Sequence, residues 1–170
     1  MSFLSRLLGT APDPKDALRP LWHAVVTEAR RPAWYAQHGV ADTVDGRFDM
    51  ILAVMALVIL RLERNPERVT DTARLTELFV DDMDGQLRQQ GIGDPALGKR
   101  MGKIVAAAGG RIGAFRDARA GERSLTDVVE KNVTLTEGSD PQATALAFEQ
   151  LAGRLDGLSE EDVMAGNIAP

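Results

Sequence analysis

The chain has 170 residues, of which 44% are hydrophobic and 26% charged, and this length and composition are typical of one globular domain. Its formal net charge of −5 argues against general nucleic-acid binding, which needs a surplus of Lys and Arg to replace the counterions on phosphates, and we expect no sequence-specific nucleic-acid partner. The absence of cysteine excludes disulfides, thiolate catalysis and cysteine-ligated metals.

Residues 1–14 are predicted to form an N-terminal arm and linker, followed by one helical domain over residues 15–170. The opening MSFLSRLLG has a short apolar patch interrupted by Arg6, so it lacks the long apolar region of a secretory signal. We therefore expect a cytoplasmic protein, peripheral to the inner membrane at most. The arm has two open interpretations, an amphipathic turn that touches a membrane interface or a frayed or packed chain end.

The first main helix is predicted over residues 15–30, and the stretch that follows joins a polar loop to the most apolar segment of the chain. From Met50 to Leu62 only Arg61 is charged, and apolar residues occupy several faces of the predicted helix. The run is shorter than the ~20 apolar residues of a membrane-spanning helix. It predicts a buried central helix, with Asp42 as the capping residue and Asp45 in the first turn.

The next two predicted helices, residues 67–90 and 95–119, differ in surface character. The first carries three acids that we interpret as a solvated face, with a metal site as the weaker alternative; these acids are Asp81, Asp82 and Asp84. The second carries a stripe of small residues, which are Gly98, Gly102, Ala106, Gly109 and Gly113. Each interior glycine costs ~1 kcal/mol relative to alanine. The stripe therefore predicts close contact with another helix, either of this chain or of a partner.

Basic residues surround this glycine stripe: Lys99, Arg100, Lys103, Arg111, Arg116, Arg119 and Arg123. They are predicted to pair with the acidic helix before them or to face anionic lipid or RNA. Three further helices are expected, a short one after Ser124, a long one from Pro141 and a terminal turn capped by Ser159. Together these elements predict an all-α fold, a single compact domain of about seven helices around the buried central helix.

Two blocks of residues within 20–120 carry a family resemblance. The first contains Trp34, Tyr35, Gly39-Val40, Asp42-Thr43, Gly46-Arg47-Phe48 and Arg61-Leu62. The second contains Phe79, Asp82-Met83-Asp84, Leu87-Arg88, Gly91-Ile92-Gly93-Asp94, Lys99, Met101 and Gly110-Arg111. Their order and spacing resemble the ubiquinol-cytochrome c chaperone family, assembly factors of respiratory complex III. The chain departs from the family pattern at Ala41, Pro95 and Phe115, where proline, an aliphatic residue and tyrosine are expected.

The resemblance implies that the protein binds newly made cytochrome b until haem insertion and assembly proceed, with peripheral contact to the inner membrane or the ribosome. We take thirteen residues from the two blocks, the glycine stripe and the basic residues beside it as candidates for binding the client or a partner. They are Trp34, Tyr35, Gly39, Arg47, Asp82, Asp84, Arg88, Gly98, Lys99, Gly102, Lys103, Gly109 and Arg111.

The chemistry-bearing residues argue against an enzyme. The chain has two histidines, one tyrosine, no phosphate loop and no nucleophile elbow. A hydrolase or lyase built on His38, Asp42, Asp45 and Arg47 would need these side chains to converge on one pocket. We expect no catalytic residue, cofactor or metal. A helical regulatory or scaffold protein that binds a soluble partner stays open as the alternative function.

Overall fold

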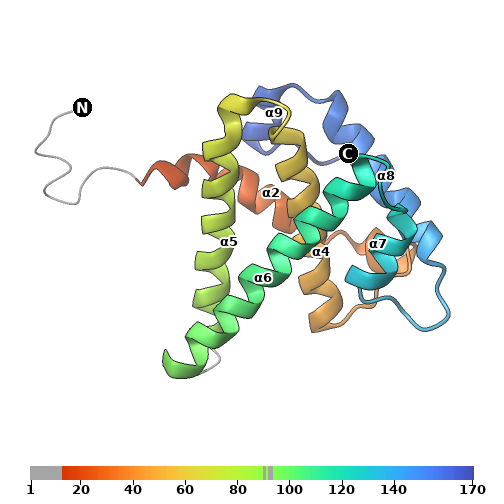
Figure 1. Cartoon of the computed structure of the whole chain (residues 1–170), viewed down its shortest axis with the longest axis horizontal. Coiled ribbons are helices and arrows are strands. Elements are labelled where there is room, and N and C mark those ends of the chain that lie inside the picture. Colours follow the sequence, from red (N-terminus) through yellow and green to blue (C-terminus); the bar gives the residue numbers. More distant parts are fainter. Residues whose placement is uncertain (1–12, 90, 92–93) are drawn as a thin grey trace, which may run out of the picture.

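Helices joined by short turns build the described part of the chain, residues 13–89, 91 and 94–170, in this computed structural model (Figure 1). The elements in chain order are η1 (Pro14–Leu18), α2 (Arg19–Ala29), α3 (Pro32–Ala36), α4 (Val44–Leu62), η2 (Pro66–Arg68), α5 (Val69–Gln89), α6 (Asp94–Arg119), α7 (Leu125–Asn132), α8 (Pro141–Gly157) and α9 (Glu160–Ala165). The predicted all-α fold is confirmed. Almost all of the predicted arm, and Ile92 and Gly93 of the second family block, lie outside the described residues.

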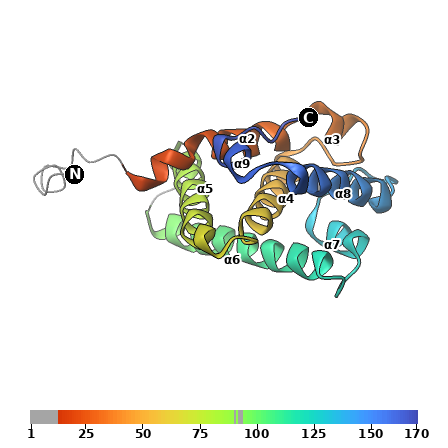
Figure 2. The same cartoon turned by 90° about the horizontal axis from the view of Figure 1, so that it is seen from above.

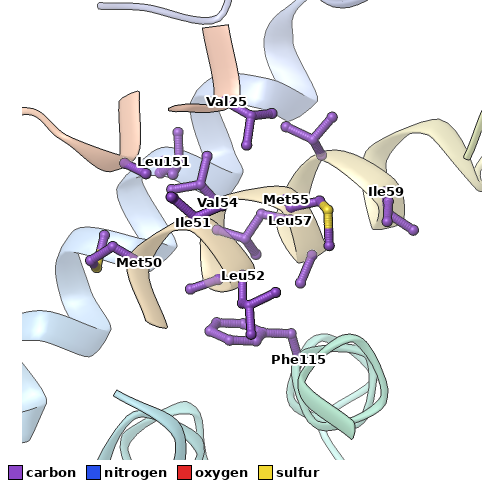
Figure 3. Packing of buried hydrophobic residues seen from close by; sticks show 14 of the residues in the cluster. Val25, Met50, Ile51, Leu52, Val54, Met55, Leu57, Ile59, Phe115 and Leu151 are labelled. Carbon is purple, nitrogen blue, oxygen red and sulfur yellow. The ribbon is translucent and has the colours of Figure 1, made fainter. Parts of the chain in front are cut away.

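The centre of the fold is α4. Viewed from above, it lies between α2 on one side and α6 on the other (Figure 2). Every side chain from Met50 to Ile59 is at most 4% exposed. Val25 of α2, Leu151 of α8 and Phe115 of α6 approach this helix from different sides (Figure 3). Since a fully buried large apolar side chain contributes ~1.5–3 kcal/mol, α4 supplies a large share of the hydrophobic stabilisation. The prediction of a buried central helix is confirmed.

The start of α4 differs from the prediction at one position. Thr43, in extended conformation, is the N-cap, and its Oγ1 accepts a hydrogen bond from Gly46 N at 3.1 Å. The prediction that Asp42 caps the helix is therefore wrong. Asp42 lies one residue outside the cap and accepts a hydrogen bond from Arg47 Nε instead. Asp45 does lie in the first turn, where its carboxylate faces the positive end of the helix dipole.

The other end of α4 holds the end of α8. Arg61, the charged residue of the apolar run, donates from Nε to Leu155 O at 2.9 Å and from Nη2 to Leu158 O at 2.7 Å. The last carbonyls of a helix have no partner within the helix, and a basic side chain is well suited to satisfy them. Arg61 thus joins two helices of the core through polar contacts at their edge.

Proline and capping signals set most helix starts as expected. Pro20, the second residue of α2, separates this helix from a 3-10 turn over residues 14–18, so the first predicted helix begins one turn late. The side chains of Asn65, Asp140 and Ser159 accept hydrogen bonds from backbone N–H groups at the starts of η2, α8 and α9. The short helix α7 begins after Ser124 as predicted, and Ser124 occupies its N-cap without a side-chain hydrogen bond.

The longest helix, α6, covers one face of the molecule. It has 26 residues and is therefore about 39 Å long at the usual rise per residue. It packs against α4, α5 and α7 and forms the lower edge of the view in Figure 2. Its inner side contributes Leu97, Ala108 and Phe115, which are buried. Its outer side is exposed and carries the glycine stripe described below.

Candidate partner-binding site

A surface hollow of about 560 Å³ lies between the end of α2, the short helix α3 and the start of α4. Two predicted residues line it. Tyr35 is held in place because its hydroxyl donates to Ala29 O at 2.7 Å, and Arg47 donates from Nε to Asp42 Oδ1 at 2.6 Å. Arg30 also lines the hollow and has no ion-pair partner among the described residues. Two guanidinium groups and one carboxylate give the hollow a net positive charge, although the whole chain is acidic.

Three titratable groups in this hollow have shifted pKa values, and the pKa of Arg47 is raised mainly by its hydrogen bond to Asp42. The hydrogen bond from Arg47 is the largest effect and lowers the pKa of Asp42; desolvation opposes it, and the positive charge of Arg47 lowers the pKa further. Burial raises the pKa of the Tyr35 hydroxyl, although the charges of Arg47 and Arg30 act in the opposite direction. Asp42 is therefore an ionised partner for Arg47 at neutral pH, and Tyr35 is a neutral phenol.

Trp34 and Gly39 shape the loop from inside. Trp34 is 3% exposed, its Nε1 donates to Glu28 O at 3.0 Å, and its ring stacks on Phe148 with centroids 4.9 Å apart. It therefore belongs to the core and does not present its ring to a partner. Gly39 has a φ of +76°, and a Cβ atom there would lie 2.8 Å from the Cβ of Ser139. The positive φ and the close approach of Ser139 both favour glycine. Gly39, one of the predicted binding residues, therefore fixes the shape of the loop and offers no side chain to a partner.

A second hollow, of about 420 Å³, lies on the other side of the α4 start. Its lining includes Asp45, Phe48, Lys103 and the ion pair between Asp49 and Arg111. Arg111, predicted to bind a partner, is only 18% exposed and also donates from Nε to Asn132 O at 3.2 Å. The described contacts of Arg111 hold helices together. The exposed cation in the lining of this hollow is Lys103.

Sequence reasoning missed the buried polar centre of this second hollow. Asp49 is 6% exposed, and its Oδ2 accepts from the backbone N of Thr134 at 3.0 Å and from the Thr134 hydroxyl at 2.7 Å. The only local signal is position, because Asp49 directly precedes the apolar run and falls within the helix. A carboxylate at such a place needs a buried cation, and Arg111 supplies it.

The loop before α4 also depends on close backbone contact. A Cβ atom at Gly46 would lie 2.0 Å from the carbonyl oxygen of Ala41. Ala41 N donates to Thr134 O at 2.9 Å, a bond that the proline expected at this position could not form. The departure from the family pattern therefore adds one hydrogen bond between this loop and the segment after α7.

The outer face of α6 carries the open glycine stripe. A Cβ atom at Gly98, Gly102 or Gly109 would meet nothing within 4 Å, and the same holds for Gly113. Val105, 44% exposed, lies beside them. The alternative that a helix of this chain packs into the stripe is therefore wrong for the described residues. Gly98, Gly102 and Gly109 are exposed and Gly113 is partly exposed, and no contact at their open sides within this part of the chain compensates their weak helix propensity.

The basic residues of α6 divide into two groups. In the second half of the helix, Arg116 pairs with Glu63 at 2.8 Å and Arg119 with Asp156 at 2.7 Å. In the first half, three exposed cations have no ion-pair partner in the described part of the chain; they are Lys99, Arg100 and Lys103. The free cations thus lie beside the first glycines of the open stripe.

The acids of α5 have partners outside α6. Asp81 accepts from Lys15 Nζ at 2.6 Å, Asp84 from Arg88 Nε at 2.7 Å, and Asp82 from Gln86 Nε2 at 3.4 Å. The predicted pairing of basic α6 side chains with these acids is absent from the described contacts. Within residues 13–89, 91 and 94–170, no group of three or more His, Asp or Glu side chains is arranged to hold a metal ion.

The four residues of the enzyme alternative do not share a pocket. Asp42 and Arg47 line the first hollow and Asp45 lines the second. The rings of His38 and Trp34 meet edge to face, with their centroids 5.5 Å apart.

Within the described residues, no helix is both long and apolar enough to cross a bilayer.

Comparison with known proteins identifies the family. The sequence profile described as ubiquinol-cytochrome C chaperone matches residues 36–169. Among solved structures, the chain is similar to the Cbp3 homolog from Brucella abortus, with a TM-score of 0.76 and 26% identity over 99% of this chain and 96% of that one. No curated protein sequence matches significantly. Since the profile spans most of the chain, from the loop before α4 to α9, this protein belongs to the ubiquinol-cytochrome c chaperone family.

Proposed function

We propose that this protein is an assembly chaperone of complex III that binds newly made cytochrome b on the outer face of α6. Membership of the family supports the role in complex III assembly. The observation that carries the choice of surface is the open glycine stripe, defined by Gly98, Gly102, Gly109 and Gly113. These residues weaken the helix, and nothing in the described part of the chain packs on them. Contact with a client compensates this loss.

The chemistry of the stripe suits an unassembled transmembrane helix. Such a helix has apolar side chains and satisfies its backbone hydrogen bonds internally, so it gains most from close packing. Small residues spaced by three or four positions let two helix backbones approach closely. Val105, exposed on the same face, adds apolar surface without filling the stripe.

The free cations at the start of α6 suit the same setting. Lys99, Arg100 and Lys103 are exposed and lack ion-pair partners among the described residues. Each contributes ~1 kcal/mol of attraction near an anionic membrane surface, which orients the protein without anchoring it. We therefore propose a cytoplasmic protein that works at the surface of the inner membrane, where cytochrome b is inserted.

The first hollow provides a second contact in this proposal. Tyr35 and Arg47 are partly or fully exposed on a loop that Trp34 and Gly39 hold from inside. Aromatic and arginine side chains are the commonest anchors at protein interfaces. The hollow therefore fits a polar segment of the client or of a partner subunit.

Site-specific photo-crosslinking in cells that assemble complex III tests the proposal. Crosslinkers at Lys103 and Ala106 are expected to capture cytochrome b, whereas one at Leu146, an exposed side chain of α8, is not. If neither α6 position captures cytochrome b, the outer face of α6 is not the binding surface. Capture of a soluble protein without cytochrome b instead identifies the regulatory or scaffold alternative.

A matched pair of variants separates binding from folding. Gly102→Leu is expected to fold, because its side chain enters open space, and to lose cytochrome b. Gly153→Leu is the control, since Gly153 is an exposed helical glycine of α8 with equally open surroundings. Equal recovery of cytochrome b by both variants would contradict binding through the stripe.

A further inference from the structure

A small polar cavity of about 90 Å³ lies between the end of α2, the far side of α3 and α8. It is separate from the first hollow, which lies against Pro32, Tyr35 and Ala36 on the other side of α3. The groups that matter for its chemistry are the side chains of Glu28, Arg31, His38, Gln150 and Arg154.

The charges around this cavity are unbalanced. Glu28 is the only acid in the lining, and its carboxylate is 1% exposed. Arg31 Nη1 donates to it at 3.0 Å, and Arg154 Nη2 lies 3.2 Å from Oε1. A buried carboxylate needs such a partner, but one carboxylate neutralises only one of the two guanidinium groups. The cluster therefore has one positive charge in excess.

One N–H donor group at the cavity also lacks a hydrogen-bond acceptor. Arg154 Nε donates to Ile168 O at 3.2 Å, but Nη2 is buried and has no hydrogen-bond partner in the described part of the chain, because its approach to Glu28 is close but poorly aligned. A buried donor left without a hydrogen-bond partner is destabilising, so the Arg154 guanidinium as a whole lacks a full set of acceptors. Since Arg31 and Arg154 remain 34% and 26% exposed, the cavity is reachable from the surface.

We propose that this cavity binds a carboxylate presented by a protein partner. A carboxylate brings the one negative charge that balances the cluster, and its two oxygens match the planar geometry of the partly exposed guanidinium groups of Arg31 and Arg154. A phosphate carries more charge than the cluster balances. The inference is independent of cytochrome b binding, because the cavity does not include any residue of α6.

Titration of the full-length protein with sodium acetate, at ionic strength held constant with sodium chloride, tests the proposal. The readout is the NMR signal of the Trp34 indole N–H, which lines the cavity and donates to Glu28 O. Trp22, which packs against Phe79, is the internal reference. A saturable shift confined to Trp34 is expected. If acetate shifts the Trp34 signal no more than sodium chloride does at the same ionic strength, water alone occupies the cavity and the proposal is wrong. Tighter binding of phosphate than of acetate would also contradict the proposal.

Two variants assign the response to the cavity. Arg154→Gln is expected to raise the half-saturating acetate concentration by roughly tenfold or more, which is the loss of one charge-assisted contact. Arg119→Gln, which removes a surface arginine paired with Asp156, leaves the response unchanged. Gln150→Glu places a tethered carboxylate at the cavity and abolishes the response, whereas Gln142→Glu on the same helix does not. Because this second pair keeps Arg154, it decides the question even if Arg154→Gln does not fold.

The source of the carboxylate is distinguished with two further probes. N-acetylaspartate amide presents a side-chain carboxylate, and N-acetylglycine presents a chain end. Whichever reproduces the Trp34 shift identifies an acidic side chain or a C-terminus as the ligand. If acetate binds but neither of these larger probes does, the cavity admits only free small anions and the partner assignment is overturned.

Discussion

The buried carboxylate of Asp49 forms an ion pair with the guanidinium of Arg111, which joins the central helix α4 to the outer helix α6 across 62 residues of sequence. The second oxygen of Asp49 accepts two hydrogen bonds from Thr134, so the segment after α7 is held at the same point. The pair therefore fixes how α6 lies on the core and, with it, the direction in which the glycine stripe faces.

Removing Arg111 leaves an uncompensated buried charge. We expect Arg111→Met to lower the free energy of unfolding by about 3–5 kcal/mol, the usual effect of breaking a buried pair on one side. Arg116→Met is the control, because Arg116 is 50% exposed and exposed pairs contribute ~1 kcal/mol or less. Urea denaturation measures both. Adding Asp49→Asn should recover part of the loss, and equal stability of the two single variants would contradict the role given to Asp49.

The core position of α4 predicts that a charge at Leu57 prevents folding. Leu57 is 3% exposed, and an unpaired buried carboxylate removes most of the ~5–15 kcal/mol that stabilises a domain. Val44→Asp on the same helix is the control. Val44 is 84% exposed and lies in the first turn, where an acid is favourable. Circular dichroism should show loss of helix for Leu57→Asp only; retained helix in that variant would contradict the packing.

The two kinds of helical glycine predict stability changes of opposite sign. Gly102→Ala should raise the free energy of unfolding by ~1 kcal/mol, because alanine is the better helix former and its Cβ meets open space. Gly46→Ala should lower it strongly, because its Cβ would overlap the carbonyl oxygen of Ala41 at 2.0 Å. Denaturant unfolding tests both, and loss of stability in Gly102→Ala would mean that the stripe is packed after all.

The hydrogen bond between Arg47 and Asp42 predicts a dependence on pH. It lowers the pKa of the Asp42 carboxyl in the folded state, so the contribution of this group to stability is present above its ordinary pKa and is lost as pH falls through the lowered value. Arg47→Ala should return the Asp42 pKa toward the ordinary value. NMR titration of the Asp42 carboxyl carbon measures the change, and an unchanged titration curve would show that the pair does not form in solution.

The first hollow predicts a loss of function without a loss of fold. Tyr35→Ala and Arg47→Ala proteins that keep their helix content should support less complex III assembly, because both side chains line this hollow. Arg64→Ala is the control, since Arg64 forms an exposed ion pair with Asp156 away from the hollow. The amount of assembled complex in membranes is the readout. Full assembly with both folded variants would remove this hollow from the proposed function.

The order and type of the helices were predictable from sequence because their signals are local. An apolar run with residues on every face of a helix has to be surrounded by other elements, and residues 50–62 are buried as predicted, with only Leu60 and Arg61 at intermediate exposure. Prolines and capping side chains mark helix starts within a few residues, which is why Pro141 and Ser159 were sufficient to place the starts of α8 and α9. Asp42 failed as a cap because two neighbouring residues, Asp42 and Thr43, carry the same local signal.

The role of the candidate residues depended on contacts between distant segments. Trp34 and Arg111 looked like binding residues, yet Phe148 and Asp49 engage them from elsewhere in the chain. The glycine stripe gave the opposite result. Its spacing alone fitted an internal or an external helix equally well, since close packing places the same demand on side-chain size in both cases. Only the tertiary structure decides which side of α6 faces the core, and burial of Leu97, Ala108 and Phe115 on one side leaves Gly98, Gly102 and Gly109 on the other.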